Sequence, residues 1–266
     1  LDLGVKGAAI ATVLSQAVSA AWILRFLTGK KSILRLRKEN FALERKIILP
    51  CVALGVSTFV MMATESLLSA SFTSSLSRFG GDIAVGSMTI ITSVCQLVVL
   101  PLQGICQGGQ PIISYNYGAR KPERMNQAIR YSVTAAITIM VIGCTVFHVA
   151  AEQLLSIFDA SEEMLRIGVP ALKIISLSFP LAGFCIGVGT VFQALGYSIY
   201  SMIISMIRQL VVLIPSAFII GKVTGDVTLV WYAFVIAELF SLTLSTIFFV
   251  TSPSVSHSSM AAEPSR

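Results

Sequence analysis

The chain has 266 residues, of which 55% are hydrophobic and 12% are charged, and its mean hydropathy is +0.84. A soluble domain carries roughly 25% charged residues, because polar side chains must cover its core. The composition therefore excludes a soluble protein and indicates one embedded in a lipid bilayer. The net charge of +6 does not indicate a nucleic-acid partner, because the basic residues collect in two short segments between apolar stretches.

Seven stretches are long and apolar enough to cross a bilayer as helices, which takes about 20 residues each. In chain order they are approximately 5–27, 47–72, 83–113, 128–150, 167–192, 199–221 and 227–250. The third and fifth are long and contain proline and glycine, so we expect tilt or kinks in them. The predicted fold class is an all-α integral membrane protein with about seven transmembrane helices.

Basic residues alternate between the connecting loops. The first and third loops are basic, and the others are not. This alternation places the two basic loops and the C-terminus in the cytoplasm. Residues 28–46 are then a basic cytoplasmic linker, which is either a short helix on the membrane surface or a plain tether. The polar residues 251–266 are expected to be a disordered cytoplasmic tail.

The first and last stretches resemble each other. Gly7–Ser15 is similar to Ala233–Ser241, and the chain begins at Leu1 within an apolar pattern. Two matching helices in the same orientation suit a transporter built from parallel halves. We therefore expect a fragment of a twelve-helix, two-bundle transporter. Residues 1–27 would be the last helix of a truncated N-terminal bundle, and 47–250 a complete C-terminal six-helix bundle.

Glu65 lies within the second apolar stretch, where an ionisable group costs at least a few kcal/mol and is a functional candidate. Thr58, Met61, Glu65 and Ser69 share one face at helical spacing. Desolvation favours the neutral form of a carboxyl group, so Glu65 is predicted to exchange protons or bind a cation. The structural alternative is an acid that reaches water at the outer boundary.

Other polar residues interrupt the later stretches. Arg208 and Gln209 lie near the middle of the sixth, and an arginine there needs an acid, carbonyl groups or water. Glu238 in the seventh is a potential partner of either Lys173 or Arg208, and the sequence does not decide between them.

The third stretch carries a row of glutamines on one face, which are predicted to line a wet cavity or to join helices: Gln96, Gln103, Gln107 and Gln110. Gly104 with Gly108, and Gly183 with Gly187, have the small-xxx-small spacing typical of close helix packing.

Motifs of known chemistry are missing. The sequence has no phosphate-binding loop, HExxH or GxSxG motif, and its five cysteines have no CxxC spacing. We therefore expect no enzyme activity, no catalytic residue, no metal site and no cofactor other than a coupling ion.

The stretch Gln110–Ala119 reads Gln-Pro-Ile-Ile-Ser-Tyr-Asn-Tyr-Gly-Ala. Together with Pro101–Gly104 and Gln107–Gly109 it resembles the signature of the MATE (multidrug and toxic compound extrusion) family, and the resemblance extends from Leu1 to Val250. It implies two six-helix bundles, of which the N-terminal one is mostly missing. It also implies export of cationic amphipathic molecules across the plasma membrane, driven by H⁺ or Na⁺.

The resemblance also bears on individual residues. Glu65 is similar in position to an acid that family members use. Some members add an Asp in the helix corresponding to 167–192, where this chain has Phe184 and Cys185. The end of the signature is predicted to be a hinge or cytoplasmic closure element comprising Pro111, Tyr115, Asn116, Tyr117 and Gly118.

Two alternative functions stay open at this point. One is a flippase for lipid-linked oligosaccharides from the same superfamily, whose cavity would need several cationic residues for phosphates. The other is a seven-helix membrane receptor or scaffold without transport activity.

Overall fold

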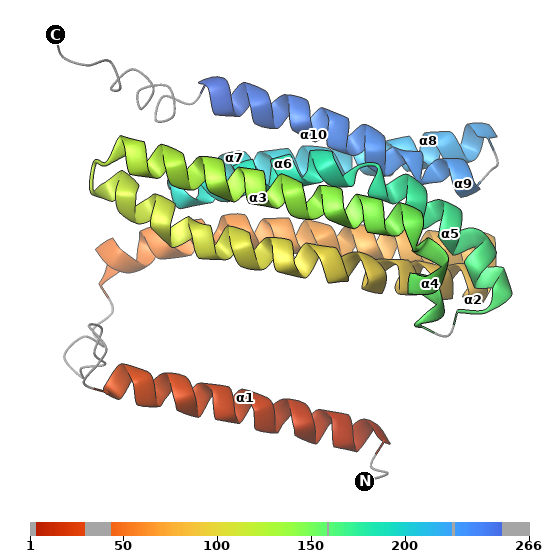
Figure 1. The fold of residues 1–266 in the computed structure, drawn as a ribbon, viewed down its shortest axis with the longest axis horizontal. Coiled ribbons are helices and arrows are strands. Elements are labelled where there is room, and N and C mark those ends of the chain that lie inside the picture. The colour runs from red at the N-terminus through yellow and green to blue at the C-terminus, as the bar shows by residue number, and fades with distance from the viewer. Residues whose placement is uncertain (1–3, 30–43, 159, 225–226, 252–266) are drawn as a thin grey trace. The chain divides into compact units, whose positions relative to one another are not determined.

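The structure is a computed structural model that describes residues 4–29, 44–158, 160–224 and 227–251 (Figure 1). Most of the predicted linker 28–46 and all but the first residue of the predicted tail 251–266 lie outside the described residues. The chain forms two units, Leu1–Cys51 and Val52–Arg266. The first contains the apolar helix α1 (Gly4–Thr28) and the start of α2; the second contains the helical bundle.

The helices that follow α1 are α2 (Arg45–Gly118), α3 (Pro122–Val149), α4 (Ala151–Ser156), α5 (Glu162–Ser176), α6 (Phe179–Ala194), α7 (Ser198–Met206), η2 (Ile207–Leu213), α8 (Ile214–Thr224), α9 (Val227–Val230) and α10 (Tyr232–Thr251).

The predicted spans are confirmed. Among the described residues, six helical segments are long and apolar enough to cross a membrane, and the pair formed by α5 and α6 gives a seventh if it counts as one broken span. Large apolar side chains such as Phe59 and Phe218, each 70% exposed, cover the outside of the bundle. Such a surface is stable in lipid and would aggregate in water.

The second and third predicted spans belong to a single element, α2, which runs out and back in Figure 1. The expected loop between them is mostly helical and breaks at Gly81, whose φ of 62° and ψ of −162° are not helical. Glycine adopts this backbone conformation without the steric cost of a Cβ atom. The turn between the spans therefore depends on one residue.

The fifth span bends by 53° between α5 and α6. Pro180 removes a backbone donor there. The Ser178 hydroxyl donates to the Ile175 carbonyl at 2.7 Å, and the Ser176 hydroxyl donates to the Lys173 carbonyl at 2.9 Å. Side chains thus satisfy carbonyl groups at the break, and the expected kink is confirmed.

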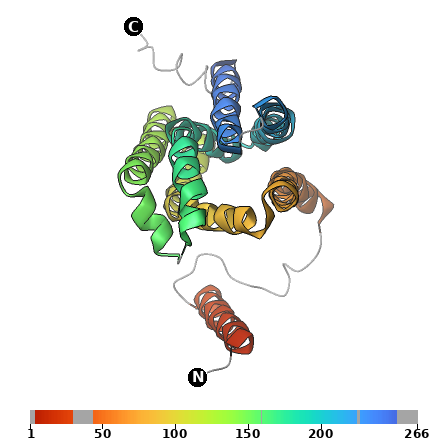
Figure 2. The same ribbon diagram turned by 90° about the vertical axis from the view of Figure 1, so that its right-hand side faces the viewer.

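The main core joins α2, α3, α5 and α6, with Leu102, Phe147 and Leu172 almost fully buried. In the end-on view these helices surround a shared interior (Figure 2). A Cβ atom on Gly183 would lie 3.0 Å from the Ala136 carbonyl oxygen, so α6 packs closely on α3 there.

The small-xxx-small expectation holds for only one of the two glycine pairs. Gly183 and Gly187 pack against α3, whereas Gly104 and Gly108 are exposed and have open space where a Cβ atom would stand. Within the described bundle, the second pair therefore makes no close helix contact.

The helix α2 ends at Gly118, and the turn that follows contains a left-handed residue, Arg120, with φ of 52°. The amide of Arg120 donates to the Tyr117 carbonyl at 3.1 Å, and that of Lys121 donates to the Asn116 carbonyl at 2.9 Å. This pair of bonds is a Schellman motif. The left-handed residue of this turn is therefore Arg120 and not a glycine.

Candidate functional site

A π-helical segment, η2, interrupts the sixth span between α7 and α8. Short π-helical segments within α-helices are rare and frequently occur at functional sites. The segment carries Arg208 and Gln209, and its Val212 and Leu213 pack against Ala233 and Ala237 of α10. These apolar contacts hold the segment against α10 and its Glu238.

Arg208 forms an ion pair with Glu238. The Arg208 Nη1 atom donates to Glu238 Oε1 at 2.5 Å, and the two side chains are 30% and 8% exposed. The structure thereby decides between the two partners that the sequence left open for Glu238. Lys173 is exposed on α5 and contributes no ion pair among the described residues. Pairing within the membrane offsets the cost of desolvating two charges.

Several buried polar atoms next to this pair lack hydrogen-bond partners among the described residues. They are Oε1 of Gln209, Oε2 of Glu238 and the hydroxyls of Ser241 and Ser245. The thiol of Cys185, on α6, lies close to both serines and within electrostatic reach of Glu238 and Arg208. The three helical segments thus enclose a polar cluster inside the bundle.

Glu65 lies within electrostatic reach of Arg208 but forms no ion pair with it, and its own side chain is exposed. Glu65 and Glu238 together carry two negative charges against the single positive charge of Arg208. With both acids ionised, the group has a net charge of −1.

The predicted stripe around Glu65 divides between two environments. Thr58, Glu65 and Ser69 are exposed, whereas Met61 is half-buried, its sulfur 4.0 Å from the hydroxyl of Ser201 on α7. A second contact joins the same helices, because the Ser198 hydroxyl donates to that of Ser57 at 3.3 Å. One side of this part of α2 is thus anchored to α7, and Glu65 lies outside the anchored side.

The glutamines of α2 occupy a different environment from Gln209. Gln96, Gln103 and Gln107 are exposed and Gln110 is half-buried. No hydrogen bond between described side chains connects them to Glu65 or Arg208. Gln209 is buried, and its Nε2 donates to the Ser205 hydroxyl at 3.3 Å.

The predicted closure element lies at the end of α2, away from this polar cluster in sequence. Asn116 is buried and its Nδ2 donates to the Ile112 carbonyl at 2.8 Å, whereas Tyr115 is 73% exposed. Pro111, Tyr117 and Gly118 are also exposed. The Ser114 hydroxyl donates to the Ala194 carbonyl at 2.8 Å, which joins the end of α2 to the end of α6.

Sequence reasoning missed the contributions of Cys185, Ser241 and Ser245 to the polar cluster. One signal was available, because Glu238, Ser241 and Ser245 have the spacing of one helix face. The π-helical segment had no such signal. Among the described residues, no group of three or more His, Cys, Asp or Glu side chains is arranged to hold a metal ion.

The family model MatE matches residues 58–219. The multidrug export protein MepA of Staphylococcus saprophyticus is 24% identical over 237 residues, which cover 89% of this chain and 52% of that protein. MepA of Staphylococcus haemolyticus is 24% identical over 238 residues, which cover 90% of this chain and 52% of that protein.

Solved structures share the fold. The MATE multidrug transporter DinF-BH superposes with a TM-score of 0.84 at 31% identity, and the match covers 96% of this chain and 57% of that one. A crystal structure of a MATE protein in the bent conformation gives a TM-score of 0.86 at 22% identity, covering 99% of this chain and 58% of that one.

Proposed function

Because this chain belongs to the MatE family of transporters, we propose that it is the C-terminal bundle, with one preceding helix, of a cation-coupled multidrug exporter. The chain spans about half the length of the curated relatives it matches, 52% for MepA of Staphylococcus saprophyticus. Transport would require the other bundle, because alternating access moves two bundles against each other. The proposed location is the plasma membrane, with the C-terminus in the cytoplasm.

The observation that carries the proposal is the exposed carboxylate of Glu65 within electrostatic reach of a partly buried ion pair. Because Glu238 already neutralises Arg208, the charge of Glu65 has no cation to balance it among the described residues. An uncompensated carboxylate at this depth has two ways to become neutral, by taking up H⁺ or by binding Na⁺. Either ion would make Glu65 the coupling residue.

Coupling then follows from differential affinity. An ion shifts a two-state equilibrium only if it binds one access state more tightly than the other. A cationic amphipathic substrate would be attracted by ionised Glu65 and released when the ion neutralises it. The exposed glutamines of α2 offer hydrogen bonds to such substrates without adding charge.

The flippase alternative receives less support. A cavity for lipid-linked phosphates needs unpaired cationic groups, and within the described spans the deep cation Arg208 is already paired with Glu238. The receptor alternative receives no support from relatives named as exporters.

The test is efflux of the fluorescent cation ethidium by a full-length protein that contains this chain, reconstituted in vesicles with an imposed H⁺ or Na⁺ gradient. Glu65→Gln is expected to reduce gradient-driven efflux at least tenfold, because the charge that the ion neutralises is gone. The matched control is Glu152→Gln, an exposed acid at the start of α4, which should leave efflux unchanged. Gradient-dependent efflux by Glu65→Gln at the wild-type rate would refute Glu65 as the coupling residue.

A further inference from the structure

The start of α3 carries a polar stripe on the outside of the bundle. Its members occupy successive turns on one side of the helix, and all are exposed: Asn126, Gln127, Arg130, Tyr131 and Thr134. The opposite side of the same turns, with Met125 and Ile129, is buried in the bundle. The stripe lines an open surface pocket of about 610 Å³.

The depth of this pocket follows from the length of α3. Its 28 residues extend ~42 Å at 1.5 Å per residue, whereas the hydrocarbon core of a bilayer is ~30 Å thick. About 12 Å of the helix, or roughly eight residues, must therefore lie outside the hydrocarbon. The C-terminal turns expose apolar side chains such as Val146 and Val149, so the excess lies at the N-terminal end. Asn126 and Gln127 then lie at the level of the lipid headgroups, and Arg130 and Tyr131 lie at the edge of the hydrocarbon.

Charge in this region favours an anion. Arg130 is exposed and has no carboxylate within ion-pair distance among the described residues. The turn before α3 adds Arg120 and Lys121, and the first turn of α3 adds Arg124 and the acid Glu123. Glu123 lies about two helical turns, or roughly 10 Å, before Arg130. The net charge of these five residues is therefore +3.

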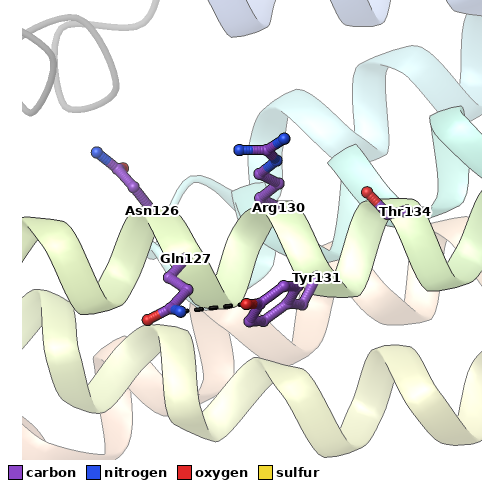
Figure 3. Close-up of a pocket in the computed structure, with 5 residues that line it drawn as sticks. All are labelled: Asn126, Gln127, Arg130, Tyr131 and Thr134. Carbon is purple, nitrogen blue, oxygen red and sulfur yellow. Dashed lines mark hydrogen bonds between the residues drawn. The ribbon is translucent and has the colours of Figure 1, made fainter.

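The side chains also offer oriented donors. Gln127 Nε2 donates to the Tyr131 hydroxyl oxygen at 3.2 Å, so the hydroxyl hydrogen of Tyr131 is free to donate to another acceptor. Figure 3 shows this pair along one edge of the exposed face of α3, and Asn126 and Arg130 along the other edge of the same face. A phosphate has several acceptor oxygens, which suit a guanidinium, an amide and a phenol together.

We propose that this pocket binds the phosphate group of an anionic phospholipid, with Arg130 as the charged contact and Asn126 and Tyr131 as hydrogen-bond donors. The lipid lies in the leaflet that faces the basic turn 120–124. Its acyl chains extend along the apolar surface of α3 beyond Thr134. This site is independent of the transport proposal, because lipid binding needs neither Glu65 nor the other bundle.

Native mass spectrometry of the purified, delipidated chain tests the site, with dioleoylphosphatidylglycerol and dioleoylphosphatidylcholine as probes. The wild-type chain is expected to bind one phosphatidylglycerol about tenfold more tightly than phosphatidylcholine. Arg130→Gln should abolish that preference, because a charge-assisted contact is lost. Tyr131→Phe should weaken phosphatidylglycerol binding about threefold to tenfold through the loss of one donor.

The matched control is Arg124→Gln, which removes the same charge outside the pocket. Arg124 lies about 9 Å along the helix from Arg130, close to one screening length at physiological salt, so its loss should cost about twofold. Equal losses for the two arginine variants would mean diffuse surface charge and would overturn the site. Displacement of phosphatidylglycerol by millimolar inorganic phosphate would overturn the lipid as occupant. Both substitutions are at exposed positions, and helix content by circular dichroism checks that the variants are folded.

Discussion

Two glutamates lie within membrane spans of the bundle, and their surroundings differ. Glu238 on α10 is buried and paired with Arg208, whereas Glu65 on α2 is exposed and unpaired in the described structure. The same carboxylate therefore has two consequences. A carboxylate that is paired with a cation on a neighbouring helix joins the two helices. A carboxylate without such a partner remains available to an ion or a substrate.

The largest effect should come from breaking the ion pair of Arg208 and Glu238. Glu238→Gln removes the negative charge and leaves the guanidinium of Arg208 uncompensated, so we expect the free energy of unfolding to fall by about 3 kcal/mol. Glu65→Gln should change it by less than about 0.5 kcal/mol, because that side chain is exposed. Unfolding in mixed detergent micelles measures both.

The double variant Arg208→Met with Glu238→Met tests whether the two charges stabilise the bundle as a pair. It removes both charges and should be within about 1 kcal/mol of the wild-type stability, because buried ion pairs are often replaceable by apolar side chains. If the double variant is as unstable as the sum of its single variants, the two residues do not stabilise the bundle as a pair.

The two glycine pairs show a similar difference between packed and open positions. Gly183→Ala places a Cβ atom 3.0 Å from both the Ala136 carbonyl oxygen and Met140 Cγ, so we expect a loss of about 1–2 kcal/mol by overpacking. Gly104→Ala meets open space and should raise stability by up to about 1 kcal/mol through helix propensity. Thermal unfolding of the two variants measures both changes in stability. A loss of stability in Gly104→Ala would show that this position is packed.

The smallest effect concerns the turn between α2 and α3. Arg120 has a left-handed φ of 52°, which glycine adopts at lower cost, so Arg120→Gly should stabilise the chain by about 0.5–1 kcal/mol. The neighbouring variant Ala119→Gly should instead destabilise it by up to about 1 kcal/mol, because Ala119 has no positive φ. The denaturation midpoint should rise for Arg120→Gly and fall for Ala119→Gly relative to the wild type. These opposite shifts test the Schellman motif.

The sequence predicted the parts of the fold that depend on local composition. Apolar length predicted the spans, and the presence of proline and glycine predicted a kink in the fifth without saying at which residue. The partner of Glu238 was left open because it lies on another helix, 30 residues away along the chain, and helical spacing says nothing about which helices meet. The same limit applies to Gly104 and Gly108, since a pattern on one helix does not say whether a neighbour covers it.

The local geometry of η2 was also beyond prediction. A π-helical segment shifts the helix face by inserting one residue per turn relative to the α-helical ladder. Nothing in Ile207–Leu213 distinguishes it from ordinary apolar helix. The position of Gln209 inside the bundle, and that of Arg208 opposite Glu238, depend on this shift.

The break between α5 and α6 has a mechanical consequence. A regular helix resists bending because its ladder of backbone bonds would have to open. Here Pro180 has already removed one donor, and the Ser178 hydroxyl serves the Ile175 carbonyl. The helix α5 is held to α3 by the Ser176 hydroxyl, 3.2 Å from His148 Nδ1, and α6 is held to α3 by close packing at Gly183. Because α5 and α6 each have their own contact with α3, the angle between them can change while both contacts are kept. The break is therefore a hinge within the span.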